Sequence, residues 1–147
     1  MAGRRRFAGV VLVDRRGWIL LQERDEHPRI DPECWGLVGG HVDEGEAVEH
    51  AAYRELAEET EVVAAPGSLR YFAELEVDHT AAYGTWDLMT TYAAATDLTD
   101  DDIVCHEGRR IVFVDPGSVP GLPLTKGAGV ILPAFLLSDL YRDLVGR

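Results

Sequence analysis

Cysteine, positive charge and long hydrophobic runs are all scarce in this sequence. Cys34 and Cys105 are its only cysteines. They are too few for a disulfide framework and lack metal-ligand spacing, so we expect a reducing compartment such as the cytoplasm. No apolar stretch reaches the ~18–20 residues of a membrane span. Acidic residues outnumber basic ones 26 to 14, for a formal charge of −12, which argues against duplex nucleic acid and anionic membranes as partners.

The remaining composition is that of one soluble domain, which we place over residues 1–147. Hydrophobic residues make up 46% of the chain and charged residues 27%, as in ordinary globular proteins. Short apolar runs alternate with helical periodicity, which predicts an α/β fold with a mixed β-sheet flanked by helices. The expected strands are 7–14, 18–23, 35–38, 69–77, 85–95 and 109–114, and the expected helices are 46–61 and 129–145, the second with Pro133 in its first turn.

The expected helix over residues 46–61 departs from a normal amphipathic pattern. Its early turns present apolar side chains to the core, and the next turns put Glu55, Glu58 and Glu59 on the same face. Like charges at this spacing repel one another, and Arg54 alone cannot neutralise three acids. A solvated, glutamate-rich helix end is the ordinary explanation. A site for a hard divalent cation such as Mg²⁺, which prefers oxygen ligands, is the functional one.

The segment before this helix supports the functional explanation. Asp43, with Glu46 three residues later, is expected to cap the start of the helix. Gly39 and Gly40 close an apolar strand, and glycine lets a backbone approach a ligand closely. A carbonyl of this pair could therefore complete a metal shell, and loop and helix are expected to face one pocket.

Residues 40–62 read GHVDEGEAVEHAAYRELAEETEV. This segment resembles the Nudix box, G-x5-E-x7-R-E-U-x-E-E-x-G-U, in which U is a bulky aliphatic residue. Two positions depart from the family: Glu61 replaces the second box glycine, and Val38 stands where many members have proline. That glycine normally helps the chain leave the helix as a left-handed cap, so Glu61 puts the helix exit in question. The matching positions are Gly40, Glu46, Arg54, Glu55, Leu56, Glu58, Glu59 and Val62.

The resemblance implies a Nudix-type α/β/α sandwich and a Mg²⁺- or Mn²⁺-dependent pyrophosphohydrolase acting on a nucleoside diphosphate linked to another group. A metal-activated water would attack phosphorus with in-line departure of the leaving group. The implied roles are direct metal ligation by Glu55 and Glu59, ligation of a second ion or a bound water by Glu58, a further ligand in the carbonyl of Gly39, orientation of the glutamates by Arg54, and support of the loop by Glu46 and Gly40.

The general base is left open at this stage. In the family it is either a box glutamate, such as Glu58, or an acid from a later loop. Glu107 is our loop candidate because it directly precedes the strand expected over residues 109–114, where relatives often carry such an acid. The three aspartates at 100–102 are the alternative, although a solvated acidic turn is their ordinary explanation.

Candidate substrate contacts are Arg24 and three aromatic residues. Arg24 follows the second strand and fits either a phosphate or base contact or a surface salt bridge. Trp35, Tyr83 and Trp86 could stack on a nucleobase, although aromatic residues on strands more often belong to a core. The five histidines, His79 among them, share no metal spacing and are expected at the surface or in loops.

The expected partner is a small nucleotide, either a nucleoside triphosphate or a nucleotide sugar. The alternatives keep the fold: a glycosyl hydrolase of nucleotide sugars, an isoprenoid diphosphate isomerase, or a nucleotide-binding module without turnover. Glycosyl hydrolases of the family usually have an altered box, and the modules usually lose its acids, whereas this box keeps its glutamates. A homodimer is compatible with the resemblance, and no stripe in the sequence establishes one.

Overall fold

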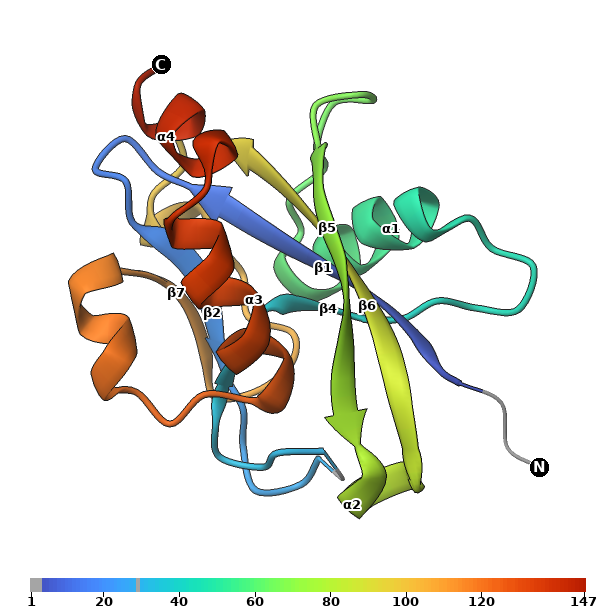
Figure 1. Cartoon of the computed structure of the whole chain (residues 1–147). Helices are drawn as coiled ribbons and strands as arrows, with labels where there is room; N and C mark the ends of the chain where they lie inside the picture. Colours follow the sequence, from blue (N-terminus) through green and yellow to red (C-terminus); the bar gives the residue numbers. More distant parts are fainter. Residues whose placement is uncertain (1–3, 29) are drawn as a thin grey trace.

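The computed structural model describes residues 4–28 and 30–147. A mixed β-sheet forms its centre, with helix α1 (Val48–Thr60) packed on one face and helices α3 (Lys126–Leu136) and α4 (Asp139–Val145) on the other (Figure 1). This arrangement confirms the predicted α/β/α sandwich. Among the described residues, no helix is both long and apolar enough to cross a bilayer.

The sheet is built around one parallel pair of strands. β1 runs parallel to β6, and the other strand pairs are antiparallel. The main path has the order β3-β2-β1-β6-β5, with β4 beside β1 and β7 beside β2, and the short helix α2 (Thr80–Tyr83) joins β5 to β6. The strands in the described part of the chain are β1 (Arg6–Val13), β2 (Ile19–Glu23), β3 (Trp35–Gly36), β4 (Val38–His41), β5 (Arg70–His79), β6 (Thr85–Ala95) and β7 (Arg110–Val114).

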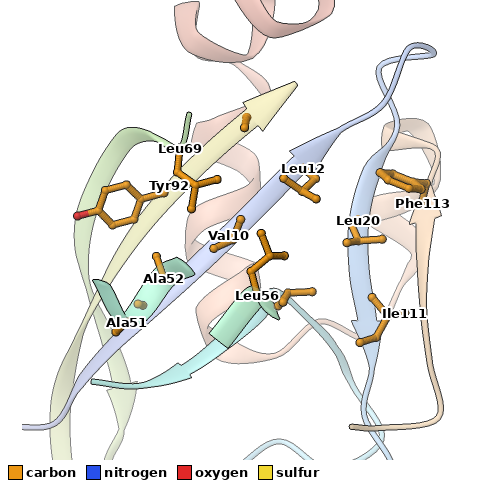
Figure 2. Packing of buried hydrophobic residues seen from close by; sticks show 13 residues of the cluster. Val10, Leu12, Leu20, Ala51, Ala52, Leu56, Leu69, Tyr92, Ile111 and Phe113 are labelled. Atoms are coloured by element: carbon orange, nitrogen blue, oxygen red, sulfur yellow. The ribbon is translucent and has the colours of Figure 1, made fainter. Parts of the chain in front are cut away.

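Strand β1 contributes to both halves of the hydrophobic core. Successive side chains of a strand point to opposite faces, so Val10 and Leu12 pack with α1, whereas Val11 and Val13 pack with α3 and α4. Figure 2 shows Leu56 of α1 beside Val10 and Leu12 of β1. All five side chains are at most 3% exposed. Burial on both faces explains why this strand is a continuous apolar run instead of an alternating one.

Helix α1 begins two residues later than the predicted helix. Its N-cap residue, Ala47, makes no side-chain capping bond. The Glu46 carboxylate instead accepts the backbone N–H of Asp43 and two N–H groups of Arg54. The expected capping of the helix by Asp43 and Glu46 is therefore wrong, because Arg54 holds the carboxylate in the loop that precedes the helix.

The other end of α1 has the left-handed cap that the box glycine normally supplies. Glu61 adopts φ 63° and ψ 11°, and its backbone N–H donates to the carbonyl of Ala57. A non-glycine residue in this left-handed backbone conformation is less stable than glycine by about 1–2 kcal/mol. The helix therefore ends with the usual left-handed geometry, although glycine is replaced, and Glu61 bears the conformational cost.

The C-terminal segment forms two helices, and the prediction of one helix over residues 129–145 is wrong. α3 begins at Lys126, capped by the hydroxyl of Thr125, so Pro133 lies in its interior and not in its first turn. Pro133 has no N–H for the carbonyl four residues earlier, but this side of the helix is exposed, so water can satisfy that carbonyl. Ser138 interrupts the segment and caps α4 through its hydroxyl.

The glycine pair lies within a strand and not after one. The strand predicted over residues 35–38 is divided into β3 and β4, and Gly39 and Gly40 pair with Gly9 and Ala8 of β1. A Cβ on Gly39 would lie 2.0 Å from the carbonyl oxygen of Ala8, so only glycine permits this approach. The pairing holds the backbone of β4 between β1 and helix α1.

Candidate active site

A cleft of about 380 Å³ opens where β1, β4, α1 and the loop after β2 meet. Its volume lies within the range of small-molecule sites, about 300–1,000 Å³. The cleft is lined by segments far apart in sequence, which the sheet topology brings together. The residues predicted from the sequence that line it are Arg24, Gly39, Gly40, Glu55, Tyr83 and Glu107.

Arg54 connects helix α1 to the loop before it. Its guanidinium donates to both oxygens of Glu46 at 2.8 Å, to the His41 carbonyl at 3.0 Å, to Glu55 at 3.0 Å and to Glu58 at 3.1 Å. The bidentate pair with Glu46 suits the planar fork of arginine. The hydrogen bonds from Arg54 hold the pKa of Glu46 well below its usual range, so this carboxylate stays ionised and the loop stays attached to the helix.

Gly40 leaves the space that the Glu55 carboxylate occupies. A Cβ at this position would lie 2.7 Å from the carboxyl carbon of Glu55, closer than real side-chain contacts allow. Glu55 therefore lies directly against the backbone of β4 and faces the cleft. Burial raises the pKa of Glu55 above its usual value, and the hydrogen bond from Arg54 only partly opposes this.

Glu59 is almost completely buried, with 4% of its surface exposed. The backbone N–H of Gly39 donates to its Oε2 at 2.8 Å, so Gly39 touches this acid through its N–H. Burial, followed by a hydrogen bond with Glu107, raises the pKa of Glu59 to about 10. A carboxyl with such a pKa holds a proton at neutral pH unless a cation takes the place of that proton.

Glu107 reaches Glu59 from a loop that two neighbouring elements hold in place. Gln22 on β2 donates its side-chain N–H to the Glu107 carbonyl at 2.8 Å, and the His106 backbone N–H donates to the Glu59 carbonyl at 3.0 Å. The His106 ring also bonds the Glu61 carboxylate. The structure thus brings the later-loop acid chosen from the sequence beside the box helix.

Glu58 does not share the inward face of α1. Its side chain is 58% exposed and bonds Arg54, whereas Leu56, with 0% exposed, occupies the core position. Leu56 and Glu59 lie three residues apart on one stripe of the helix, and Glu58 projects beside that stripe. The expectation that three box acids face the same way is therefore wrong for Glu58.

Several other candidates lie outside the cleft. Trp35 is 7% exposed and belongs to the core on the α3 side, and Trp86 is half exposed at the start of β6. Asp100 accepts the backbone N–H of Phe113, and Asp102 forms a capping box in the short 3-10 helix η1 (Asp100–Asp102). None of the three aspartates at 100–102 lines the cleft, whereas Glu107 does.

Arg24 and Tyr83 are the substrate candidates that the structure places in the cleft wall. The Nε of Arg24 is buried and has no hydrogen-bond partner within residues 4–28 and 30–147. An unsatisfied buried donor is costly, and an anionic ligand oxygen would satisfy it. The Arg5 guanidinium lies over the Tyr83 ring, 3.8 Å from its centroid, and covers one face of it.

The donor chemistry of the site fits a hard divalent cation. Beyond the effect of burial, Glu107 raises the pKa of both Glu55 and Glu59 through charge repulsion, which a cation would relieve. In the described part of the chain, no three His, Cys, Asp or Glu side chains already surround one ion position. Mg²⁺ commonly binds through one or two carboxylates together with water and substrate phosphates, and this arrangement provides such a partial shell.

The sequence prediction missed a buried, hydrogen-bonded histidine in the cleft wall. His79, expected at the surface or in a loop, is 5% exposed, and its Nδ1 lies 2.8 Å from Oδ2 of Asp87. The surface expectation is therefore wrong for His79. Alternation along β5 was the available signal, because Val77 is buried and residue 79 points to the same face.

Known proteins share both the sequence pattern and the fold. A family model of the NUDIX domain matches residues 3–135. An RNA pyrophosphohydrolase from Sphingopyxis alaskensis is 43% identical over 53 residues, which cover 36% of this chain and 32% of that protein. This chain therefore matches about a third of the length of that relative.

Two solved structures extend the comparison to most of the chain. A MutT NUDIX hydrolase from Burkholderia pseudomallei is 27% identical, with a TM-score of 0.74 over 90% of this chain and 98% of that one. The Nudix hydrolase RenU from M. smegmatis is 26% identical, with a TM-score of 0.67 over 92% of this chain and 85% of that one. With the box in α1, the glycine pair against it and this overall match, the chain belongs to the NUDIX domain family.

Proposed function

We propose that this protein hydrolyses the diphosphate linkage of a nucleoside diphosphate derivative, such as a nucleoside triphosphate or a nucleotide sugar, with Mg²⁺ or Mn²⁺. One observation carries the proposal: Glu55, Glu107 and Arg24 line one cleft beside the buried Glu59. Among the residues that the structure describes, the Nε of Arg24 has no hydrogen-bond partner. The names of the relatives, an RNA pyrophosphohydrolase and a MutT NUDIX hydrolase, support the same type of bond.

The acids of α1 are the residues that would hold the cation. Glu55 and Glu59 would ligate it directly, and Glu58, which bonds Arg54 on the exposed side of the helix, would hold a second ion or a bound water. The carbonyl of Gly39 is a further donor. When bound, the cation neutralises charge on the diphosphate and lowers the pKa of a coordinated water.

The rest of the chemistry belongs to residues of the chain. Glu107 is the general base that accepts the proton of the attacking water, and Arg24 donates a hydrogen bond to a phosphate oxygen. Tyr83, in the same cleft wall, contacts the base of the nucleotide. Arg54 and Glu46 keep Glu55 in position through their shared hydrogen bonds. In-line attack on phosphorus depends on such positioning more than on covalent catalysis.

The test is phosphate and pyrophosphate release, with products identified, from nucleoside triphosphates, nucleotide sugars, ADP-ribose, dinucleotides and a 5′-triphosphorylated RNA. We expect Glu59→Gln to lower kcat on the preferred substrate by about 10²-fold or more, as for loss of a group that positions charge in the transition state. The matched control is Glu74→Gln, an exposed glutamate on β5, which should leave the rate unchanged. Equal release by wild type and Glu59→Gln would contradict the role of Glu59.

The same panel separates the alternatives. A glycosyl hydrolase would release a sugar and leave the diphosphate intact, and an isoprenoid diphosphate isomerase would release no phosphate. A binding module would bind a nucleotide with no turnover at any metal concentration. Each result would overturn the proposed reaction while leaving membership of the family intact.

A further inference from the structure

A second polar group lies in the cleft wall and takes no part in the reaction proposed above. His79 ends β5, and Asp87 lies on β6 in the same hairpin, next to α2 (Figure 1). Asp87 is 0% exposed and accepts three hydrogen bonds: from the Arg5 backbone N–H at 2.9 Å, the Thr85 hydroxyl at 2.8 Å and His79 Nδ1 at 2.8 Å. The carboxylate is thus held by three donors, and it holds the imidazole in turn.

The contacts of Asp87 settle which ring nitrogen of His79 carries a proton. Burial alone would raise the pKa of Asp87, but the hydrogen bonds from Arg5, Thr85 and His79 outweigh it and lower that pKa. An ionised carboxylate only accepts hydrogen bonds, so Nδ1 of His79 is the donor. Within residues 4–28 and 30–147, no hydrogen bond uses Nε2. Because His79 lines the cleft, Nε2 is the nitrogen left for a ligand.

Flat rings surround this imidazole. Phe7 lies edge-on to His79, with ring centroids 5.2 Å apart, and tilted to His41 at 4.4 Å. Tyr83 lies 6.2 Å from His79 and 6.3 Å from His41. All four residues line the cleft. Such rings are the surfaces on which nucleobases stack.

Stability alone does not explain the His79–Asp87 pair. Burial removes water from the Asp87 carboxylate and the His79 ring, and a well-packed apolar pair of similar volume is often at least as stable. Only a few positioned polar groups occur in the wall of a typical ligand site, and they determine which ligand is bound. His79, which Asp87 holds in a cleft lined by rings, is such a positioned polar group.

We propose that His79, positioned by Asp87, selects the base of the nucleotide by accepting a hydrogen bond at Nε2 from its exocyclic amino group. This inference rests on the proposed function, because it makes the ring-lined part of the cleft the site of the base. In the tautomer whose one ring proton lies on Nδ1, facing Asp87, the imidazole presents an acceptor at Nε2. Adenine, guanine and cytosine carry an amino group, and uracil does not.

The experiment measures the binding of AMP, GMP, CMP, UMP and ribose 5-phosphate by calorimetry, without added metal. We expect one of the amino-bearing nucleotides to bind at least 10-fold more tightly than UMP and ribose 5-phosphate. His79→Asn keeps a side-chain donor near Asp87 but ends short of the cleft. This variant should lose about 3- to 10-fold in affinity for the preferred nucleotide, as for one hydrogen bond, and bind ribose 5-phosphate unchanged.

Three controls accompany the binding measurement. Tyr71→Phe changes an exposed ring on the same strand and should leave all affinities unchanged. Thermal unfolding of His79→Asn shows whether the variant is folded, and His79→Gln, whose amide reaches the position of Nε2, should restore part of the preference if the cleft contact matters.

Two outcomes would overturn the inference: a preference for UMP, or the same base preference in wild type and His79→Asn. The binding assay needs no turnover, so its failure is separate from failure of the proposed function, which the release assay with Glu59→Gln reports. If substrates are hydrolysed, His79→Asn should raise KM for the preferred nucleotide and leave kcat nearly unchanged.

Discussion

At Glu59, burial and negative charge oppose each other. The side chain is 4% exposed, accepts one hydrogen bond from the Gly39 backbone and shares a hydrogen bond with Glu107. Arg54, the arginine of the box, forms ion pairs with Glu46, Glu55 and Glu58 and not with Glu59. An acid in this setting is stabilised by a proton or by a cation, and the two compete.

This competition predicts how the stability of the metal-free protein depends on pH. The pKa of Glu59 is raised from about 4.5 to about 10, so between these values the folded state keeps a proton that the unfolded state releases. Stability is then highest below pH 4.5 for this group and falls as pH rises toward 10. We expect Glu59→Gln, a neutral side chain of the same shape, to raise the Tm at pH 8 by about 3–8 °C, equivalent to about 1–2 kcal/mol.

The measurement is thermal unfolding in EDTA at pH 5 and pH 8. Glu59→Gln should flatten the difference between the two pH values, and Glu74→Gln should follow wild type. A lower Tm for Glu59→Gln than for wild type at pH 8 would show that the carboxylate is stabilised by a contact other than those described above.

Helix α1 and the loop that follows η1 depend on each other at the helix exit. The left-handed turn at Glu61 directs the chain out of the helix, and the ring of His106 bonds the Glu61 carboxylate. The backbone N–H of Val104 also donates to the carbonyl of Thr60 at 3.2 Å. The loop that carries Glu107 is therefore attached to the last turn of the box helix, and Glu61, in place of the box glycine, adds a side-chain hydrogen bond to that attachment.

Two variants can separate the backbone strain at Glu61 from the stabilisation that its contact with His106 provides. Glu61→Gly and Glu61→Ala both remove the hydrogen bond with His106, but only glycine relieves the left-handed backbone. We expect Glu61→Gly to be more stable than Glu61→Ala by about 1 kcal/mol in urea unfolding. Glu61→Ala should be less stable than wild type by up to about 1 kcal/mol, the usual contribution of an exposed side-chain pair. Equal stability of the two variants would mean that the backbone relaxes at this position.

The acidic residues are unevenly distributed over the molecule. Eight acids and one arginine lie between positions 43 and 61, a net of −7 of the total charge of −12. The folded structure gathers much of this charge around the cleft, where Arg54 bonds four of the carboxylates. An anionic substrate approaches such a surface more easily when a divalent cation has offset part of the charge.

We therefore expect Mg²⁺ to stabilise the folded protein in a pH-dependent way. At a concentration 100 times its dissociation constant, the ion should add about 2.7 kcal/mol. The gain should be larger at pH 8 than at pH 5, because Glu55 and Glu59 must lose their protons to bind it. Differential scanning fluorimetry with Mg²⁺ and then with EDTA measures the gain and its reversal. Identical melting curves with millimolar Mg²⁺ and with EDTA at pH 8 would contradict the metal site.

Local patterns of the sequence determined most of the fold and the catalytic acids of the proposed site. The apolar run of β1 requires burial on both faces, and the box spacing places Arg54, Glu55 and Glu59 on one helix beside a glycine pair. These features depend on contacts between residues close together in the chain, where helix and strand periodicity fix which side chains share a face. The helix exit at Glu61 was left in question by the sequence, because the residue lacks the freedom of the box glycine, and the structure shows that it still takes the left-handed turn.

Tertiary structure alone decided which of these residues face the cleft and what else joins them. Glu58 turns outward because Leu56 takes the core position, and Trp35 packs in the core instead of the cleft. The pairing of β5 with β6 buries His79 on Asp87, and a loop between η1 and β7 brings Glu107 to Glu59. The physical reason is that burial and pairing across the sheet depend on partners distant in sequence, whereas the pattern along a chain records only which face a side chain can take.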